Sequence, residues 1–173
     1  GETEVTTPLI LSGDLAHSTN VYPSATQQAF MDAGIRMLNI PRGYGPSLLF
    51  NHDVAPWNIT EVRQAVALVI EREENAFLTN GMGATGTVDM AGLADEAVPL
   101  LMNQEDIDQL DHYDFDTARA EELMTAAGFT RNDDGKWVDS EGNTIASEFK
   151  FPAEFADFSG MAQNAVEQMN AFG

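Results

Sequence analysis

Apolar residues recur at helical spacing in one long stretch of this chain, and this stretch constrains the fold more than any other feature. Between positions 60 and 79 they fall on one face of a helix, as Val62, Val66, Val69, Ile70 and Phe77. Asn58 or Thr60 can cap the start, and Asn80 with Gly81 ends the pattern. The sequence therefore predicts one long helix with a face in the core.

The sequence predicts three further helices, near residues 24–34, 115–127 and 157–171. Ser24 and Gln27 have the spacing of a capping box, and Asp114 is a suitable N-cap for the helix near 115–127. Gly34 and Gly128 supply the left-handed backbone at which two of these helices end.

Short apolar runs bounded by turn residues predict strands at 8–11, 35–40, 47–51 and 145–151. Turn residues also predict a hairpin centred on 140–143, and the glycine-rich stretch 82–110 predicts an irregular excursion with short helical turns at most. Strands alternating with helices indicate an α/β fold of the mixed α+β kind, with a mixed sheet flanked by helices.

Charge limits the partners of this chain. It has 28 Asp and Glu residues against 8 Lys and Arg residues, a formal net charge of −20. A nucleic acid would be repelled and would meet no cluster of basic side chains, so we expect no nucleic-acid partner. An acid excess of this size without long acidic runs suggests adaptation to high salt, where screening weakens the repulsion.

The sequence contains no recognisable catalytic, cofactor or metal motif. His17, His52 and His112 are far apart, and there is no cysteine, so we expect no metal site and no cofactor. Carboxylates are too abundant for an acid/base pair to be recognised by inspection. A carbohydrate-active hydrolase using paired carboxylates therefore stays open as an alternative, as does a non-catalytic protein-interaction domain.

Two stretches of the chain resemble extracellular solute-binding proteins of family 5. In the first, an apolar run ending in Asn51 is followed by a Pro-aromatic turn and by the V-R-Q-A helix of residues 61–73. This helix closes on Ile70-Glu71-Arg72, where Glu71 replaces the aspartate usual in the family. The second stretch, residues 113–129, is similar to the family's Y-D-x-x-x-A helix with its A-G-aromatic ending.

The resemblance implies a non-enzymatic, solute-binding component of an ABC importer that captures peptides or oligosaccharides outside the cell. Its partners would be that solute and the membrane permease, and its location extracellular, either membrane-anchored or periplasmic. Proteins of this family are longer and close two lobes over the solute, so the resemblance implies that the chain is an internal fragment. Residues 1–45 would belong with the first lobe or hinge, and residues 46–173 would form part of the second lobe.

The resemblance also implies where the solute would bind. Three segments resemble those that border the solute in the family, and the ligand-binding candidates in them are Thr19, Asn20, Arg42, Tyr44, Phe155 and Asp157. Their chemistry is suitable because hydroxyl, amide, guanidinium and carboxylate groups can hydrogen-bond a solute while a tyrosine ring stacks on it. Ala16 stands where the family usually has an acidic residue, so that position is left out.

Overall fold

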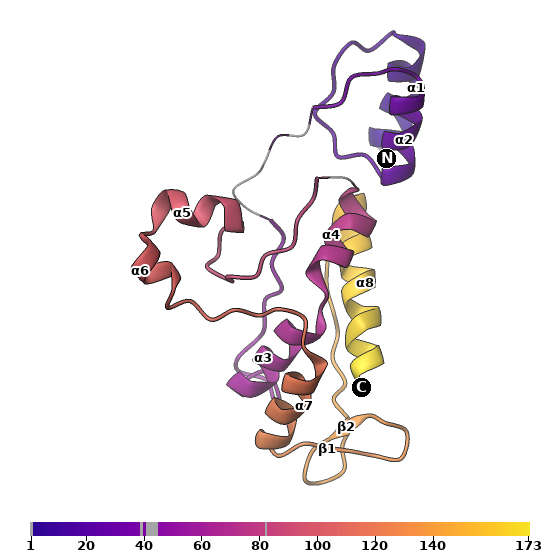
Figure 1. Ribbon diagram of the computed structural model, residues 1–173. Coiled ribbons are helices and arrows are strands. Elements are labelled where there is room, and N and C mark those ends of the chain that lie inside the picture. Colours follow the sequence, from indigo (N-terminus) through magenta and orange to yellow (C-terminus); the bar gives the residue numbers. More distant parts are fainter. Residues whose placement is uncertain (1, 39, 41–44, 82) are drawn as a thin grey trace.

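Pairs of helices organise this protein, as seen in a computed structural model that describes residues 2–38, 40, 45–81 and 83–173 (Figure 1). In chain order, the described elements are α1 (Glu2–Ser12), α2 (Ser24–Asp32), α3 (Thr60–Val69), α4 (Arg72–Asn80), the 3-10 helix η1 (Asp95–Ala97), α5 (Val98–Leu101), α6 (Gln104–Ile107), α7 (Thr117–Ala126), β1 (Thr130–Arg131), β2 (Trp137–Val138) and α8 (Ala156–Phe172). The mixed class predicted from the sequence is confirmed, and helices dominate it.

The hydrophobic core lies where α3 packs on α7. Leu68 of α3 is 1% exposed, and Ala120 of α7 is fully buried. The small Ala120 side chain lets the two helices approach closely, and Trp137 of β2 closes the cluster. The apolar face expected near 60–79 is therefore in the core along α3, but Phe77, which belongs to α4, is 58% exposed, so its assignment to the core is wrong.

The single helix predicted over 60–79 is wrong, because α3 and α4 are separate. Ile70 and Glu71 have extended backbones, with ψ of 107° and 96°. The Glu71 carboxylate accepts a hydrogen bond from the backbone N–H of Glu74 and so caps α4. Arg72 binds the carbonyl oxygen of Ala67 at 2.5 Å, at the end of α3. The helix breaks because Glu71 and Arg72 satisfy the backbone groups at the break.

The strands predicted at 8–11, 35–40, 47–51 and 145–151 are not found among the described residues. Residues 8–11 belong instead to α1, although Pro8 lies inside it. Thr6 and Thr7 support this helix because their hydroxyls donate to the carbonyl oxygens of Glu2 and Thr3. A short apolar run fits a helix as well as a strand, and here its neighbours favour the helix.

The hairpin is displaced from its predicted centre. Strands β1 and β2 pair antiparallel, with Thr130 opposite Val138, around a turn at residues 132–136. The turn at 140–143 closes only an isolated bridge between Val138 and Thr144. Asp139 organises that turn, and a hydrogen bond from the Asn143 side chain lowers the pKa of its carboxyl group.

The predicted helix caps are also corrected. Thr60 and Asn58 do not cap α3, whose N-cap is Ile59, and the capping box at Ser24 does not form because Gln27 points elsewhere. Asp116, not Asp114, caps α7 by accepting from the backbone N–H of Arg119 at 2.9 Å. Helices α2, α7 and α8 nevertheless occupy the predicted places to within a few residues.

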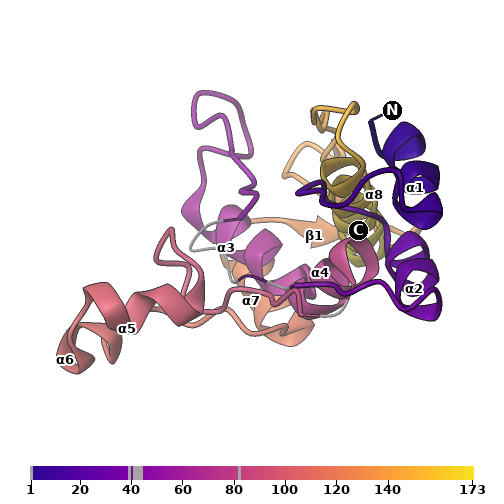
Figure 2. The same ribbon diagram turned by 90° about the horizontal axis from the view of Figure 1, so that it is seen from above.

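The excursion predicted at 82–110 contains short helical turns, as expected. Helices α5 and α6 project from the body in both views (Figures 1 and 2). At the base of this arm, the backbone N–H of Tyr113 donates to the carbonyl oxygen of Val88 at 3.2 Å. The arm is therefore attached to the body through a narrow neck.

Candidate functional site

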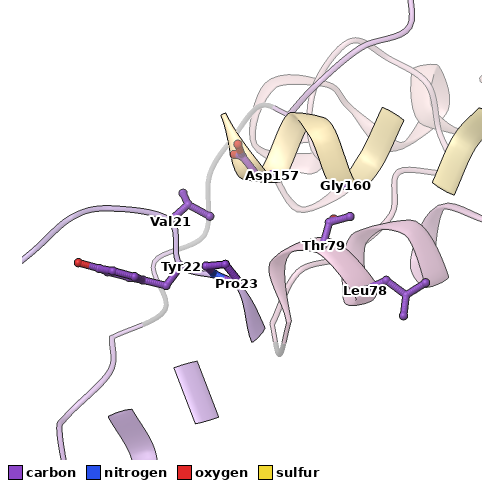
Figure 3. A pocket seen from close by; sticks show the side chains of 7 residues that line it. All are labelled: Val21, Tyr22, Pro23, Leu78, Thr79, Asp157 and Gly160. Carbon is purple, nitrogen blue, oxygen red and sulfur yellow. The ribbon is translucent and has the colours of Figure 1, made fainter. Parts of the chain in front are cut away.

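Three segments far apart in the sequence enclose a pocket of about 160 Å³. They are the residues just before α2, the C-terminal end of α4 and the first turn of α8 (Figure 3). The residues that line the pocket are Val21, Tyr22, Pro23, Leu78, Thr79, Asp157 and Gly160. A hydrocarbon wall with one carboxylate can hold an apolar group that carries a hydrogen-bond donor or a positive charge.

Tyr22 fixes the first wall of the pocket through its ring, which points away from α4 and α8 (Figure 3). The ring is buried against Phe30 of α2, edge to face, with the ring centroids 5.0 Å apart. Its hydroxyl hydrogen-bonds with Thr6 Oγ1 at 2.9 Å and with Ser18 Oγ at 2.8 Å. These contacts hold the residues around Tyr22 in place between α1 and α2.

Gln27 joins this first wall to the end of α4. Its side-chain Nε2 donates to the carbonyl oxygens of Tyr22 at 2.7 Å and Asn80 at 2.8 Å. Gly81 lies against the same amide with a φ of +75°, and a Cβ there would come 3.0 Å from Gln27 Oε1. A glycine at this position satisfies both the backbone angle and the close contact.

Helices α4 and α8 meet along a seam of side-chain amides. Asn75 Nδ2 donates to the carbonyl oxygen of Met161 and to Asn164 Oδ1, both at 2.9 Å. Gln168 Nε2 donates to the same Asn164 oxygen at 2.7 Å, and Gln168 Oε1 accepts from the backbone N–H of Glu71 at 2.5 Å. We call these residues (Glu71, Asn75, Asn164, Gln168) the amide seam. It leads from the α3–α4 break toward the pocket.

Gly160 lets the two helices come together at the pocket end of the seam. A Cβ at this position would lie 2.9 Å from Thr79 Cγ2, closer than carbon atoms ordinarily approach. The spacing of α4 and α8 beside the pocket therefore depends on the missing side chain of Gly160.

Asp157 provides the carboxylate of the pocket. Its Oδ1 accepts from the backbone N–H of Phe158 at 2.9 Å, and no other hydrogen bond to this side chain occurs within the described residues. It lies in the first turn of α8, where a negative charge stabilises the helix terminus. One carboxylate oxygen thus supports the helix while the group borders the pocket.

The structure separates the other predicted ligand-binding residues from this pocket or does not describe them. Asn20 Nδ2 donates to Thr6 Oγ1 at 3.3 Å, and Thr19 is exposed, so neither lines the pocket. Phe155 is 54% exposed with its ring centroid 5.9 Å from that of Phe158. Arg42 and Tyr44 lie outside the described residues.

Sequence reasoning missed six of the seven lining residues. Val21, Tyr22 and Pro23 immediately follow Thr19 and Asn20, so the predicted segment borders the pocket through residues next to the two predicted ones. Thr79 and Gly160 carry no functional motif. The one available signal was Gly160, because a glycine inside a predicted helix indicates a close approach.

A second hollow of about 70 Å³ lies over the α3–α4 break, and Arg72 forms part of its wall. The Arg72 guanidinium donates to the carbonyl oxygens of Ala67 and Thr87, each at 2.5 Å, and to that of Tyr113. Burial lowers the pKa of Arg72, and the carboxylates of Asp114, Asp95 and Glu71 partly offset this. The hydrogen-bonding capacity of Arg72 is directed at the backbone, so we assign it a structural role.

Gly86 allows this arrangement. A Cβ at Gly86 would lie 2.8 Å from backbone atoms of Arg72 and Glu73, which cannot move aside as a side chain could. The Ile70-Glu71-Arg72 motif that carried the family resemblance thus ends one helix, caps the next and joins both to the loop after α4.

Within the described residues, no three His, Asp or Glu side chains gather as a metal ion would require. His112 pairs with Asp89, with Nδ1 and Oδ1 3.0 Å apart. In that same part of the chain, every helix is too short or too polar to cross a lipid bilayer.

Comparison with known proteins identifies the family. The model described as the middle part of the bacterial extracellular solute-binding proteins of family 5 matches residues 2–173. The chain therefore belongs to this family, whose proteins have a two-lobed α/β fold and bind solutes for ABC importers. Comparison with curated proteins gives no match, and comparison with solved structures gives none either.

Proposed function

We propose that this chain captures a peptide or an oligosaccharide outside the cell and delivers it to the permease of an ABC importer. The match of the family model over residues 2–173 is the observation that carries this proposal. The protein acts without chemical change to the solute, and it works either in the periplasm or anchored to the outer face of a membrane.

The pocket beside Asp157 is part of the solute site in this proposal. Drug-sized ligands occupy roughly 300–1,000 Å³, so a hollow of about 160 Å³ suits one substituent of a solute and not the whole molecule. Asp157 accepts from an ammonium or hydroxyl group of the solute, and Val21, Pro23 and Leu78 contact its apolar atoms.

The remaining candidates extend this site. Thr19, Asn20 and Phe155 lie near the lining residues in sequence, and Arg42 and Tyr44 supply a guanidinium and an aromatic ring. Residues 1–45 belong with one lobe and residues 46–173 with the other. Limited proteolysis tests this division, because it predicts early cleavage near residue 45 and intact fragments on either side.

Calorimetric titration of the full-length protein tests the site. We expect Arg42→Ala, Tyr44→Ala and Asp157→Asn each to weaken binding of short peptides or oligosaccharides. The melting temperature should stay nearly unchanged in the first two variants and fall slightly in Asp157→Asn, which removes the charge at the start of α8. Asp133→Asn, in an exposed hairpin turn, is the matched control and should bind as the parent does. Parent-like affinity in all three site variants would refute the residue assignments. A parent protein that binds neither solute class would refute the solute assignment.

The charge of the chain supports a working environment of concentrated salt. With a formal net charge of −20, repulsion among surface carboxylates opposes folding, and the distance over which it acts shrinks from about 10 Å at 0.1 M salt to about 3 Å at 1 M. The melting temperature should therefore rise between low and molar KCl. A flat or falling trend would contradict adaptation to salt.

A further inference from the structure

One acceptor sequence for N-linked glycosylation occurs in the chain, at Asn58-Ile59-Thr60. No other asparagine in the sequence is followed two positions later by serine or threonine. Such a sequence is modified only where the protein passes through an exporting membrane and the asparagine is accessible. The family of this chain is extracellular, so the first condition is met at the family level.

The structure places this sequence at an accessible turn. Asn58 is the last residue of the turn at residues 52–58 and is exposed, and within the described residues its side-chain amide takes part in no hydrogen bond. Thr60 is exposed as the first residue of α3. Ile59 between them has an extended backbone, with φ of −90° and ψ of 124°. Both side chains that a glycosyltransferase must recognise are therefore on the surface.

We propose that Asn58 carries an N-linked glycan on the exported protein. The donor is an oligosaccharide linked to a lipid through a diphosphate. Asn58 Nδ2 attacks the anomeric carbon, so that a carbon–nitrogen bond forms and the bond from that carbon to the diphosphate oxygen breaks. A base of the transferase takes one Nδ2 proton, and the lipid diphosphate leaves. The transferase recognises the Thr60 hydroxyl.

The folded contacts of this segment affect the rate of transfer. Ile59 packs against the core, and Thr60 Oγ1 accepts from Arg63 Nη2 at 3.1 Å. A transferase that grips Thr60 must first displace Arg63, whose Nη1 also holds the carbonyl oxygen of Trp57 at 2.6 Å. The folded segment should therefore be a slower acceptor than the unfolded chain.

The glycan leaves the candidate solute pocket open. Asn58 precedes α3, whereas the pocket lies at the C-terminal end of α4 and the first turn of α8, and none of its lining residues comes from the segment around Asn58. Loss of the glycan should consequently leave solute affinity unchanged.

Mass spectrometry of the full-length protein recovered from the organism that naturally produces it tests the proposal. Trypsin releases residues 43–63 as one peptide, because it cleaves after Arg42 and after Arg63 and no Lys or Arg lies between them. We expect this peptide to carry the added mass of an oligosaccharide, with fragment ions that place the sugar on Asn58 and not on Asn51. Asn58→Gln and Thr60→Ala produced in the same organism should abolish the added mass, and Thr60→Ser should retain it.

An unmodified 43–63 peptide in the parent protein would overturn the proposal. Added mass that persists in Asn58→Gln would overturn it as well. Thr60→Ser keeps the hydroxyl. Loss of the glycan in that variant would therefore contradict recognition of Thr60 through its hydroxyl. The refolded, unmodified chain should also be a poorer acceptor in vitro than the unfolded chain, and equal transfer to both would refute the proposed effect of the Arg63 contacts.

Discussion

The α3–α7 pair and the α4–α8 pair are built from different interactions. Leu68, Ala65 and Val62 of α3 are each at most 1% exposed and pack against α7. Helix α4 contributes no fully buried residue, and it is joined to α8 through the amide seam. Apolar burial dominates the first pair, whereas in the second pair α8 buries Ala162 and Ala165 and α4 adds mainly directional hydrogen bonds.

This difference shows that one set of interactions stabilises the fold while another sets the positions of the helices that border the pocket. Burial of apolar side chains contributes roughly 1.5–3 kcal/mol for each large residue and is insensitive to small displacements. A side-chain hydrogen bond adds only about 0.5–1.5 kcal/mol net but fixes distance and angle. The amide seam thus sets the register of the two helices that border the pocket, and the core keeps the chain folded.

Truncation in the core should give the largest effect. Leu68→Ala removes one of the largest fully buried side chains, and we expect it to lower the free energy of unfolding by about 2–5 kcal/mol. Urea denaturation followed by circular dichroism measures this change. Leu100→Ala is the matched control, because Leu100 is 81% exposed on α5 and should change stability little. Equal effects of the two variants on the free energy of unfolding would contradict the assignment of Leu68 to the core.

Loss of the Arg72 side chain should have an intermediate effect. Arg72→Met keeps most of the aliphatic volume but removes the donors to the carbonyl oxygens of Ala67, Thr87 and Tyr113, at a cost of about 1–3 kcal/mol. Hydrogen exchange should also quicken at Tyr113, at the neck of the arm. The control is Arg119→Met, whose guanidinium is exposed. An Arg72 variant as stable as this control would show that the break between α3 and α4 does not need the arginine.

Deletion within the amide seam should have the smallest effect. We expect Asn75→Ala and Asn164→Ala each to cost about 1 kcal/mol, and the double variant to cost less than the sum because the two side chains share a hydrogen bond. Thermal denaturation of the parent, both single variants and the double variant measures this coupling. Strict additivity would mean that the seam does not act as one unit.

Helices could be predicted from the sequence because their signals are local. The spacing of Ala120 and Met124 and the stop at Gly128 placed α7 to within a few residues. The division between α3 and α4 could not be predicted in this way. It depends on Arg72 reaching carbonyl oxygens 15 and 41 residues farther along the chain. The local pattern of apolar residues does not predict such a long-range contact.

The strand predictions were wrong for a related physical reason. A run such as 145–151 becomes a strand only when another strand supplies hydrogen bonds, and the partner is not encoded in the run itself. The site was predictable in the same limited sense. The resemblance led to Asp157, which lines the pocket, but the meeting of Val21, Thr79 and Gly160 is a product of tertiary packing.

The neck beneath α5 and α6 makes the arm a suitable place for the insertion of a further domain. Val88 and Tyr113 are already joined by a backbone hydrogen bond of 3.2 Å, so the two ends of the excursion lie as close as the ends of a tight turn. Residues inserted between them lengthen a loop whose two ends are already held together. Each doubling of the loop length costs only about 0.6 kcal/mol in entropy. The arm should therefore accept a reporter domain inserted between α5 and α6, while the α3–α7 core unfolds at nearly the parental urea concentration.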